Sequence, residues 1–187
     1  MVKHRCGWCI GDPLYEAYHD QEWGVPVKED TVLFEFLVLE TFQAGLSWIT
    51  ILRKRENFRI AFDHFNYHQI ANYSQQKIDA LLANPGIVRN KLKVHATVSN
   101  AQAFLEIQKE FGSFSNYIWR FVHGTPIQNA YKHYKDAPAK TPLSDTISKD
   151  LKKRGFKFVG STVIYAFLQA TGMVNDHEVD CFRYSEV

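Results

Sequence analysis

Four side chains of the types that bind zinc lie near the two ends of this 187-residue chain. Cys6 and His19 follow the spacing C-x12-H, and His177 and Cys181 follow the spacing H-x3-C. Two cysteines and two histidines are a common ligand set for a closed, structural zinc ion. Residues four apart share one side of a helical turn, so the second pair is expected to point the same way. One ion bound by all four would join the two ends of the chain.

Cys9 leaves other uses of this region open, because residues 6–9 read C-G-W-C. A C-x2-C pair can be a redox dithiol or half of a zinc knuckle. A redox motif is expected to follow a strand, and the few polar and basic residues before Cys6 do not predict one. Chance pairing is a further alternative, since the chain holds three cysteines and eight histidines and His177 could cap a helix.

A second group of residues combines aromatic rings with a carboxylate. Glu40 lies on an otherwise apolar helical face, three and four residues after Leu37 and Phe36. A buried carboxylate is costly unless it has a partner, so Glu40 either faces solvent or serves a pocket. A pocket here would suit a flat, cationic aromatic ligand, because rings stack on its faces and a carboxylate accepts hydrogen bonds from its amino edge. The rings, which would otherwise belong to the core, are those of Trp8, Tyr15, Tyr18, Trp23 and Trp48.

A third feature is a tight turn at Pro85 and Gly86 between two helical patterns. Proline and glycine permit such a turn, and the helix after it would begin with free N–H groups and the positive end of its dipole. That end suits a DNA phosphate, and Arg89, Lys91 and Lys93 lie close to it in the sequence. An ordinary helix–helix turn with a solvated basic end is the alternative.

The elements that must position these residues are mostly helices, so the sequence predicts an all-α fold. Asp30, Ser47, Ser74 and Ser144 are expected to open four of them. Residues 124–142 contain three of the six prolines and are expected to form a loop. Apolar residues at helical spacing predict helices over residues 31–43, 48–62, 75–83, 89–111, 114–122, 144–155 and 160–171.

Length and composition indicate one domain over residues 1–187. A zinc ion bound by all four candidate ligands would tie its terminal segments 1–25 and 172–187. A net charge of +2 neither requires nor excludes a nucleic-acid partner. No apolar run approaches the roughly 18 residues of a membrane span, and no signal peptide is recognised. The small, odd number of cysteines favours a reducing cytoplasm, where thiols bind metal more often than they pair.

Five ordered blocks cover nearly the whole chain: CGW at 6–8, DPLYxxYHDxEWGVP at 12–26, QAGLSW at 43–48, KKRGFKFVG at 152–160 and VNDH at 174–177. Together they resemble the 3-methyladenine DNA glycosylase I family. The resemblance implies a helix–hairpin–helix DNA glycosylase fold, with the hairpin near residues 85–91. It also implies one structural Zn²⁺ bound by Cys6, His19, His177 and Cys181. The hairpin departs from the common L-P-G-V-G form, because Ile87-Val88-Arg89 stands where a second glycine would be.

The resemblance further implies that the chain excises 3-methyladenine from double-stranded DNA, with the alkylated nucleotide flipped out of the stack. A monomer that hydrolyses the N-glycosidic bond and leaves an abasic site is expected. Many helix–hairpin–helix glycosylases carry a catalytic aspartate after the hairpin, but here no aspartate occurs between Asp79 and Asp136. Lys91 is interpreted as a phosphate contact and not as a Schiff-base lysine, so a monofunctional enzyme is expected.

Residue roles follow from the chemistry and the resemblance together. Glu40 is expected to accept hydrogen bonds from the adenine amino edge, and Trp48 to stack on the base. Leu46, on the Gly45 turn, is expected to fill the gap that the flipped base leaves in the DNA. Contacts to the DNA backbone are expected from Gly86, Arg89 and Lys91. The remaining pocket walls are expected from Tyr15, Tyr18, Trp8 and Trp23.

Three other functions compete with this interpretation. A protein that binds damaged DNA without cutting it would keep the hairpin and the zinc but should lack an intact pocket. A zinc hydrolase is disfavoured because four protein ligands leave no position for a catalytic water. A simple interaction module with a zinc staple would leave the central motifs unexplained.

Overall fold

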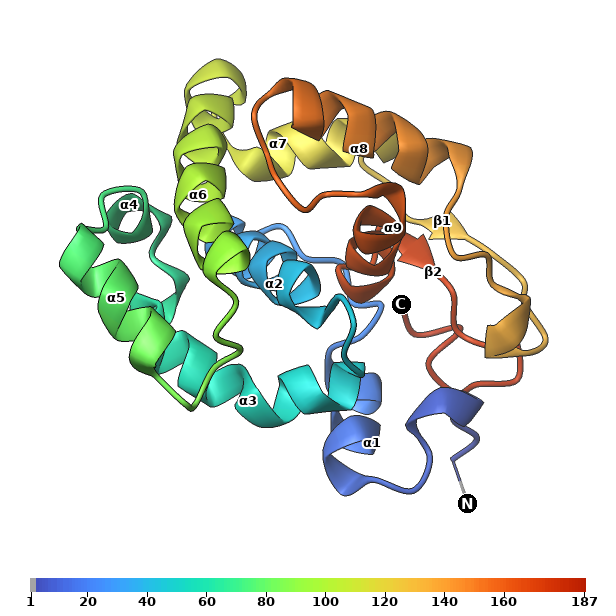
Figure 1. The fold of residues 1–187 in the computed structure, drawn as a ribbon. Helices are drawn as coiled ribbons and strands as arrows, with labels where there is room; N and C mark the ends of the chain where they lie inside the picture. The colour runs from blue at the N-terminus through green and yellow to red at the C-terminus, as the bar shows by residue number, and fades with distance from the viewer. Residues whose placement is uncertain (1–2) are drawn as a thin grey trace.

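The computed structural model describes residues 3–187, and most of them are helical, as the sequence predicts (Figure 1). A short two-stranded parallel sheet is the exception, so the fold is mostly helical and not entirely so. No helix within residues 3–187 is long and apolar enough to cross a membrane. In chain order the elements are η1 (Gly7–Cys9), α1 (Pro13–Gln21), α2 (Asp30–Gln43), α3 (Trp48–Ala61), η2 (Asp63–Phe65), α4 (Tyr67–Ile70), α5 (Gln75–Ala83), α6 (Lys91–Phe111), α7 (Phe114–Trp119), η3 (Arg120–Val122), β1 (Ile127–Gln128), η4 (Tyr134–Asp136), α8 (Pro142–Lys153), α9 (Ser161–Ala170) and β2 (Val174–Asn175).

Helix α2 forms the centre of the molecule. Every residue from 33 to 42 is buried, because α2 packs against α3, α6, α7 and α9 (Figure 1). A helix that is apolar on nearly all sides is expected to be enclosed in this way. Two carboxylates, Glu35 and Glu40, are nevertheless carried into this core.

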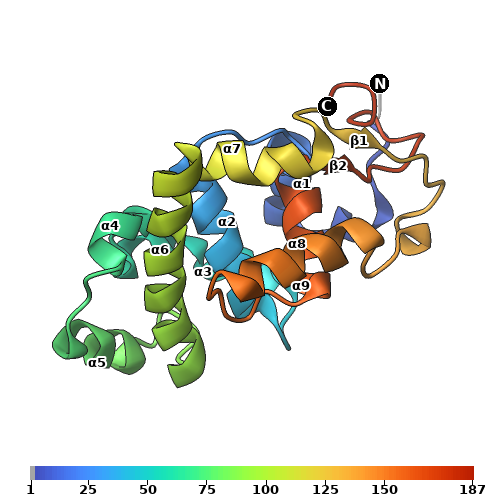
Figure 2. The same ribbon diagram turned by 90° about the horizontal axis from the view of Figure 1, so that it is seen from above.

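The two-stranded sheet connects the expected loop 124–142 to the C-terminal segment. Ile127 pairs with Val174 and Gln128 with Asn175, both in parallel register. The C-terminal segment also contacts the N-terminal segment, since the Phe182 N–H donates to the His4 carbonyl at 3.0 Å. The two ends of the described chain are therefore neighbours, as Figure 2 also shows.

Several predicted element boundaries differ from those of the structure. Asp30 does not cap α2; its carboxylate instead accepts from the N–H groups of Phe114 and Ser115 at the start of α7, both at 2.8 Å. Helix α8 begins at Pro142 and not at Ser144, because Thr141 is the N-cap and forms a capping box with Ser144.

The prediction that His177 and Cys181 lie on one helical turn is wrong. These residues follow β2 in a non-helical segment of the described chain, where the Cys181 N–H donates to the Glu178 carbonyl at 2.8 Å. Asn175 shapes this segment, because its Oδ1 accepts from the His177 N–H at 3.2 Å. Such a side-chain-to-backbone bond gives the chain an alternative to a helix.

Replacement of Asp30 by alanine is expected to lower the free energy of unfolding by about 1–2 kcal/mol, because α7 loses a side chain that caps two of its N–H groups. Denaturant unfolding monitored by circular dichroism measures this change. Glu29→Ala is the matched control, since Glu29 is exposed and makes no side-chain capping bond to the described chain. Equal stabilities of the two variants would contradict the capping role.

Candidate functional site

A cavity of about 220 Å³ opens between the N-terminal segment, α2, α3 and α9. It is smaller than the roughly 300–1,000 Å³ of typical sites for drug-sized ligands, so it suits a ligand of one or two rings. The structure places all six predicted pocket residues on its wall, although they come from five separate elements or loops. These residues are Trp8, Tyr15, Tyr18, Trp23, Glu40 and Trp48.

Edge-to-face packing holds the aromatic wall in place. The Trp8 ring lies 4.8 Å from the ring of Tyr15 and 5.0 Å from that of Trp23, between centroids. The Tyr15 end of α1 is fixed by Asp12, whose carboxylate accepts from the Tyr15 N–H at 3.2 Å. Edge-to-face pairs of this kind are favourable and directional, so the rings form a preformed wall.

An ion-pair network fixes the far end of α1 to the core. The buried Arg55 guanidinium on α3 donates to Glu35 on α2 and to Glu22 at the end of α1, both at 2.7 Å. Trp23 directly follows Glu22, so the network holds the chain next to Trp23.

Three buried polar atoms at this cavity make no hydrogen bond. Across residues 3–187, five buried side-chain polar atoms lack a partner, and three of them are Glu40 Oε2, Tyr18 OH and Trp48 Nε1. Buried polar groups are nearly always paired in folded proteins, so such groups call for an explanation. One acceptor and two potential donors at one cavity indicate a site that completes its hydrogen bonds with a ligand.

Burial also changes the acidity of these groups. It raises the pKa of Glu40 to about 8 and that of Tyr15 to about 12, since water no longer stabilises the charged forms. The Tyr18 pKa is raised well above its ordinary value, first by burial and then by the neighbouring Glu40. A cationic ligand would reverse the change at Glu40, because an opposite charge favours the carboxylate.

The cavity wall contains further residues that were not among the predicted site residues. Tyr134 is fixed through its backbone, since its N–H donates to Glu178 Oε1 at 2.9 Å. The buried Asp176 carboxylate accepts from Gln169 at 2.9 Å and from the Tyr165 hydroxyl. The added wall residues are Gln43, Tyr134, Ala137, Ala166, Gln169 and Asp176.

The loop between α2 and α3 lies at the edge of the cavity. Gly45 there has a φ of +83°, a conformation that favours glycine, and Leu46 beside it is 39% exposed. Lys93 of α6 holds the loop: its buried ammonium donates to the carbonyls of Phe42 and Ala44 at 3.3 and 3.2 Å. The start of α6 and the Leu46 loop are thus directly connected.

The α5–α6 connection has the tight turn that the sequence predicts. Asn84 Oδ1 accepts from the Gly86 N–H at 2.8 Å, and a Cβ at Gly86 would lie 3.2 Å from the Asn57 side chain. Glycine is therefore favoured by close approach and not by an unusual φ. Asn90 caps α6, while Arg89 and Lys91 are exposed beside it.

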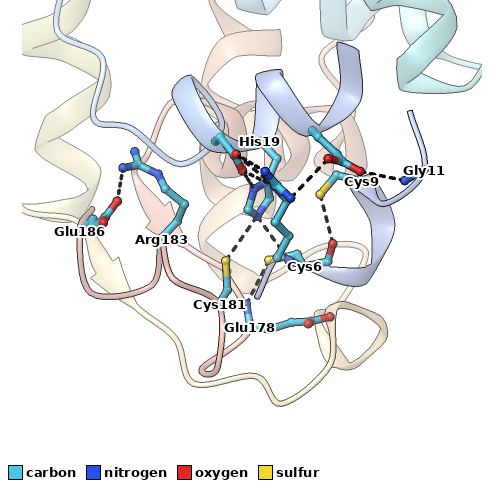
Figure 3. Close-up of polar contacts among 11 residues, drawn as sticks. Cys6, Cys9, Gly11, His19, Glu178, Cys181, Arg183 and Glu186 are labelled. Carbon is cyan, nitrogen blue, oxygen red and sulfur yellow. Dashed lines mark hydrogen bonds and ion pairs between the residues drawn. The ribbon is translucent and has the colours of Figure 1, made fainter. Parts of the chain in front are cut away.

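A separate cluster of potential metal ligands lies where the two chain ends meet. Cys6, His19 and Cys181 are buried, and their ligand atoms lie within 4.8 Å of one another (Figure 3). Cys9 is next to this group but outside it, and its thiol donates to the Cys6 carbonyl at 3.2 Å. The cluster of three could hold a metal ion.

His177 lies beside this cluster without belonging to the group of three. Its ring centroid is 5.2 Å from that of His19, and its buried Nε2 has no hydrogen-bond partner in the described chain. Burial lowers the pKa of His177 to about 3, so the ring is neutral near pH 7. Close approach to the ring requires Gly24, whose φ is +80° and where a Cβ would lie 2.5 Å from His177 Cε1.

Oxygen acceptors orient both imidazoles. His19 Nδ1 lies 2.9 Å from Asp20 Oδ1, and His177 Nδ1 lies 2.9 Å from Asn175 Oδ1. An acceptor at Nδ1 favours a proton there and leaves Nε2 unprotonated, which is the usual arrangement around metal-binding histidines. The donor types and their orientation fit a metal ion.

Comparison with known proteins agrees with this geometry. The family model for methyladenine glycosylase matches residues 8–184. DNA-3-methyladenine glycosylase 1 of Escherichia coli K12 is 46% identical over 180 residues, or 96% of each chain. The Haemophilus influenzae DNA-3-methyladenine glycosylase is 46% identical over 177 residues, covering 95% of this chain and 96% of that protein.

Solved structures match equally well. A crystal structure of a 3-methyladenine DNA glycosylase I superposes with a TM-score of 0.93 at 49% identity, covering 96% of this chain and 98% of the other. The Staphylococcus aureus enzyme, whose structure was determined for its recognition of 3-methyladenine, gives a TM-score of 0.93 at 39% identity and 97% coverage of both chains. The fold and site therefore define a DNA base glycosylase enzyme. The chain belongs to the methyladenine glycosylase family.

Glu40→Gln is expected to change how stability depends on pH. Between about pH 4.5 and pH 8 the unfolded chain releases the Glu40 proton while the folded chain keeps it, so the wild type loses stability as pH rises. The variant lacks this loss and should be more stable above pH 8 by a few kcal/mol, since one pKa unit corresponds to about 1.4 kcal/mol. Urea unfolding at several pH values measures the difference, and parallel stability curves would contradict it.

Proposed function

We propose that this chain removes 3-methyladenine from alkylated double-stranded DNA. The observation that carries the proposal is the meeting of three unpartnered buried polar atoms, on Glu40, Tyr18 and Trp48, at one aromatic cavity. A methylated adenine offers ring faces for stacking, an amino group for a carboxylate and a positive charge. The names of the relatives, which are 3-methyladenine glycosylases, support the same substrate.

The proposed reaction is hydrolysis of the N-glycosidic bond. The target base is hidden in the DNA stack, so the nucleotide must first be flipped into the cavity. Methylation at N3 makes the base cationic, which weakens its bond to the sugar and lets it leave as a neutral molecule. The base leaves with the bonding electron pair, a water oxygen then bonds to C1′ of the sugar and releases a proton to solvent, and the product is an abasic site. No residue needs to form a covalent intermediate, which makes the enzyme monofunctional.

Glu40 selects the damaged base in this mechanism. Its desolvated carboxyl group gains most from a cationic partner, because opposite charges interact strongly where water is excluded. It accepts hydrogen bonds from the amino edge, while Trp48 stacks on the ring. Tyr15 and Tyr18 shape the pocket and offer hydroxyl groups. The remaining aromatic walls are those of Trp8 and Trp23.

The proposed DNA-binding elements are the α5–α6 hairpin and the Leu46 loop. The Gly86 turn lets the DNA backbone approach the start of α6, and the exposed Arg89 and Lys91 contact phosphates. Leu46 fills the gap in the stack, as apolar wedges do in other DNA-bending proteins. The chain acts as a monomer formed by one domain over residues 1–187.

A structural Zn²⁺ ion completes the proposal. Cys6, His19, His177 and Cys181 would hold it, because two thiolates and two oriented imidazoles form a tetrahedral set. The ion would supply a fixed link between the two chain ends and no chemistry at the base, since four protein ligands leave no open position. His177 supports this assignment through its buried, unpartnered Nε2.

Release of free base from methylated duplex DNA, resolved by chromatography, tests the function directly. Free 3-methyladenine together with DNA that breaks at the vacated sites under alkali is the expected result. Folded protein that binds damaged duplex but releases no base would instead identify a non-catalytic damage-binding protein.

Glu40→Ala is expected to reduce excision by about 10²-fold or more, the effect of removing one preorganised polar group from a closed site. Metal content and folding should stay unchanged, since Glu40 is not one of the potential metal ligands. Single-turnover release of 3-methyladenine measures the effect. Glu56→Gln, which changes a side chain that is 67% exposed on α3, is the control. Wild-type excision by Glu40→Ala would remove Glu40 from the active site.

Elemental analysis of the purified protein is expected to give about one zinc per chain. Cys181→Ser should lose the metal and unfold at a lower temperature, because metal binding and folding are coupled. Cys9→Ser should keep both, since Cys9 lies outside the ligand group. Loss of metal from Cys9→Ser and not from Cys181→Ser would contradict the ligand assignment.

A further inference from the structure

The loop between α8 and α9, residues 154–160, lies on the same side of the molecule as the proposed DNA-binding elements. In Figure 2 this loop, the α2–α3 loop and the α5–α6 region all lie toward the lower edge, which is the side that faces the viewer in Figure 1. The α8–α9 loop has no part in the base cavity, because none of its residues lines the wall. Its role is therefore not explained by the pocket.

Phe158 in this loop is both strained and exposed. Its φ is +57°, a left-handed conformation that is unfavourable for a bulky residue without local hydrogen bonding. The flanking side chains of Phe156 and Val159 are buried at 3% and 0% exposure, whereas that of Phe158 is 40% exposed. The backbone therefore adopts a costly conformation with an apolar ring left in solvent.

The surrounding structure holds this loop rigidly in that conformation. Asn100 of α6 bonds both backbone groups of Lys157: its Oδ1 accepts from the N–H at 2.8 Å and its Nδ2 donates to the carbonyl at 3.0 Å. Ser148 of α8 donates to the Val159 carbonyl at 2.6 Å. Strain persists where the surroundings impose it, and such residues cluster at functional sites.

Three lysines lie close to Phe158 in the sequence. Lys157 precedes Phe158, and Lys152 and Lys153 end the preceding helix; all three are exposed. An aromatic side chain among lysines matches the chemistry of nucleic-acid surfaces, where cations meet phosphates and rings meet bases or sugars. Asn100 lies on α6, the helix whose first turn carries the proposed phosphate contacts, so one rigid helix connects the two regions.

We propose that Phe158 is part of a second DNA-contact surface, on which its ring packs against a base or sugar of the duplex beside the flipped nucleotide. The lysines at 152, 153 and 157 contact the neighbouring phosphates. The inference rests on the proposed action on duplex DNA, and it adds a surface that grips the DNA independently of the base cavity.

Phe158→Gly gives a sharp test, because glycine accepts a φ of +57° and relieves the strain. The variant is expected to be at least as resistant to heat as the wild type. Its affinity for a short duplex with a tetrahydrofuran abasic analogue should fall about tenfold, within the range for loss of one stacked aromatic ring. Phe158→Tyr, which keeps the ring, should bind the duplex like the wild type.

Two further measurements distinguish the contribution of the Phe158 ring to DNA binding from that of the lysines and from any effect on the base cavity. The salt dependence of duplex binding should be unchanged in Phe158→Gly and shallower in Lys157→Ala, since only the lysine releases counterions from DNA. Binding of free 3-methyladenine, followed by tryptophan fluorescence, should be unchanged in both variants. Loss of free-base binding in folded Phe158→Gly would show a structural role and overturn the proposal.

Wild-type duplex affinity in Phe158→Gly would also overturn this surface. The outcome is distinct from failure of the proposed function. If the wild-type protein releases no base but loses duplex affinity in Phe158→Gly, the proposed DNA-contact surface is supported and the proposed glycosylase activity is overturned. If the wild type excises the base and Phe158→Gly binds the duplex as tightly as the wild type, the activity is supported and the Phe158 surface is overturned.

Discussion

A carboxyl group without a partner inside the central helix is the constraint on which the site depends. Glu40 is 4% exposed and lies within a run of buried residues, where an unpaired charge is expensive. Glu40 is enclosed because α2 packs against α3, α6, α7 and α9. Burial of the unpaired Glu40 carboxyl group lowers the stability of the free protein, and a ligand that supplies the missing partner removes this penalty. The same residue therefore lowers stability and favours ligand binding.

The other parts of the site are arranged around that carboxyl group by contacts between segments far apart in the sequence. Arg55 connects α1, α2 and α3, and Lys93 connects α6 to the loop that follows Glu40. Glu178 connects the chain ends to the cavity, because its N–H donates to Cys6 Sγ at 3.3 Å while its carboxylate holds Tyr134. The potential metal cluster and the pocket are thus separate sites that both depend on Glu178.

Much of the helical architecture could be predicted, since apolar spacing and local caps act over short distances. Helix α5 begins after Ser74, whose hydroxyl accepts from the Lys77 N–H as expected. The role of Asp30 could not be predicted from a local pattern, because the two N–H groups that it caps lie more than eighty residues later, at the start of α7. Likewise, a two-residue strand such as β1 exists only because β2 lies beside it.

The candidate site was predictable where an unusual residue type stands in a local pattern. A carboxylate among apolar residues indicates a pocket role for Glu40, and segments rich in aromatic residues predict the aromatic wall. Tyr134 and Gln169 carry no such signal, since a tyrosine in a loop and a glutamine on an apolar helix are ordinary features. The spacing of His177 and Cys181 fits a helical turn as well as a loop. The hydrogen bond from the His177 N–H to Asn175 Oδ1 stabilises the loop.

The closeness of Cys6 and Cys181 has a consequence for how the protein is made. During synthesis the N-terminal segment emerges first, but its partners are added only when the C-terminal segment follows. Closing so long a loop costs chain entropy, and topologies with many distant contacts fold slowly. We therefore expect the wall formed by Trp8 and its neighbours to be the last part of the cavity to form. A nascent or truncated chain would then contain the central helices without a closed pocket, so the proposed binding of a base would require the C-terminal segment.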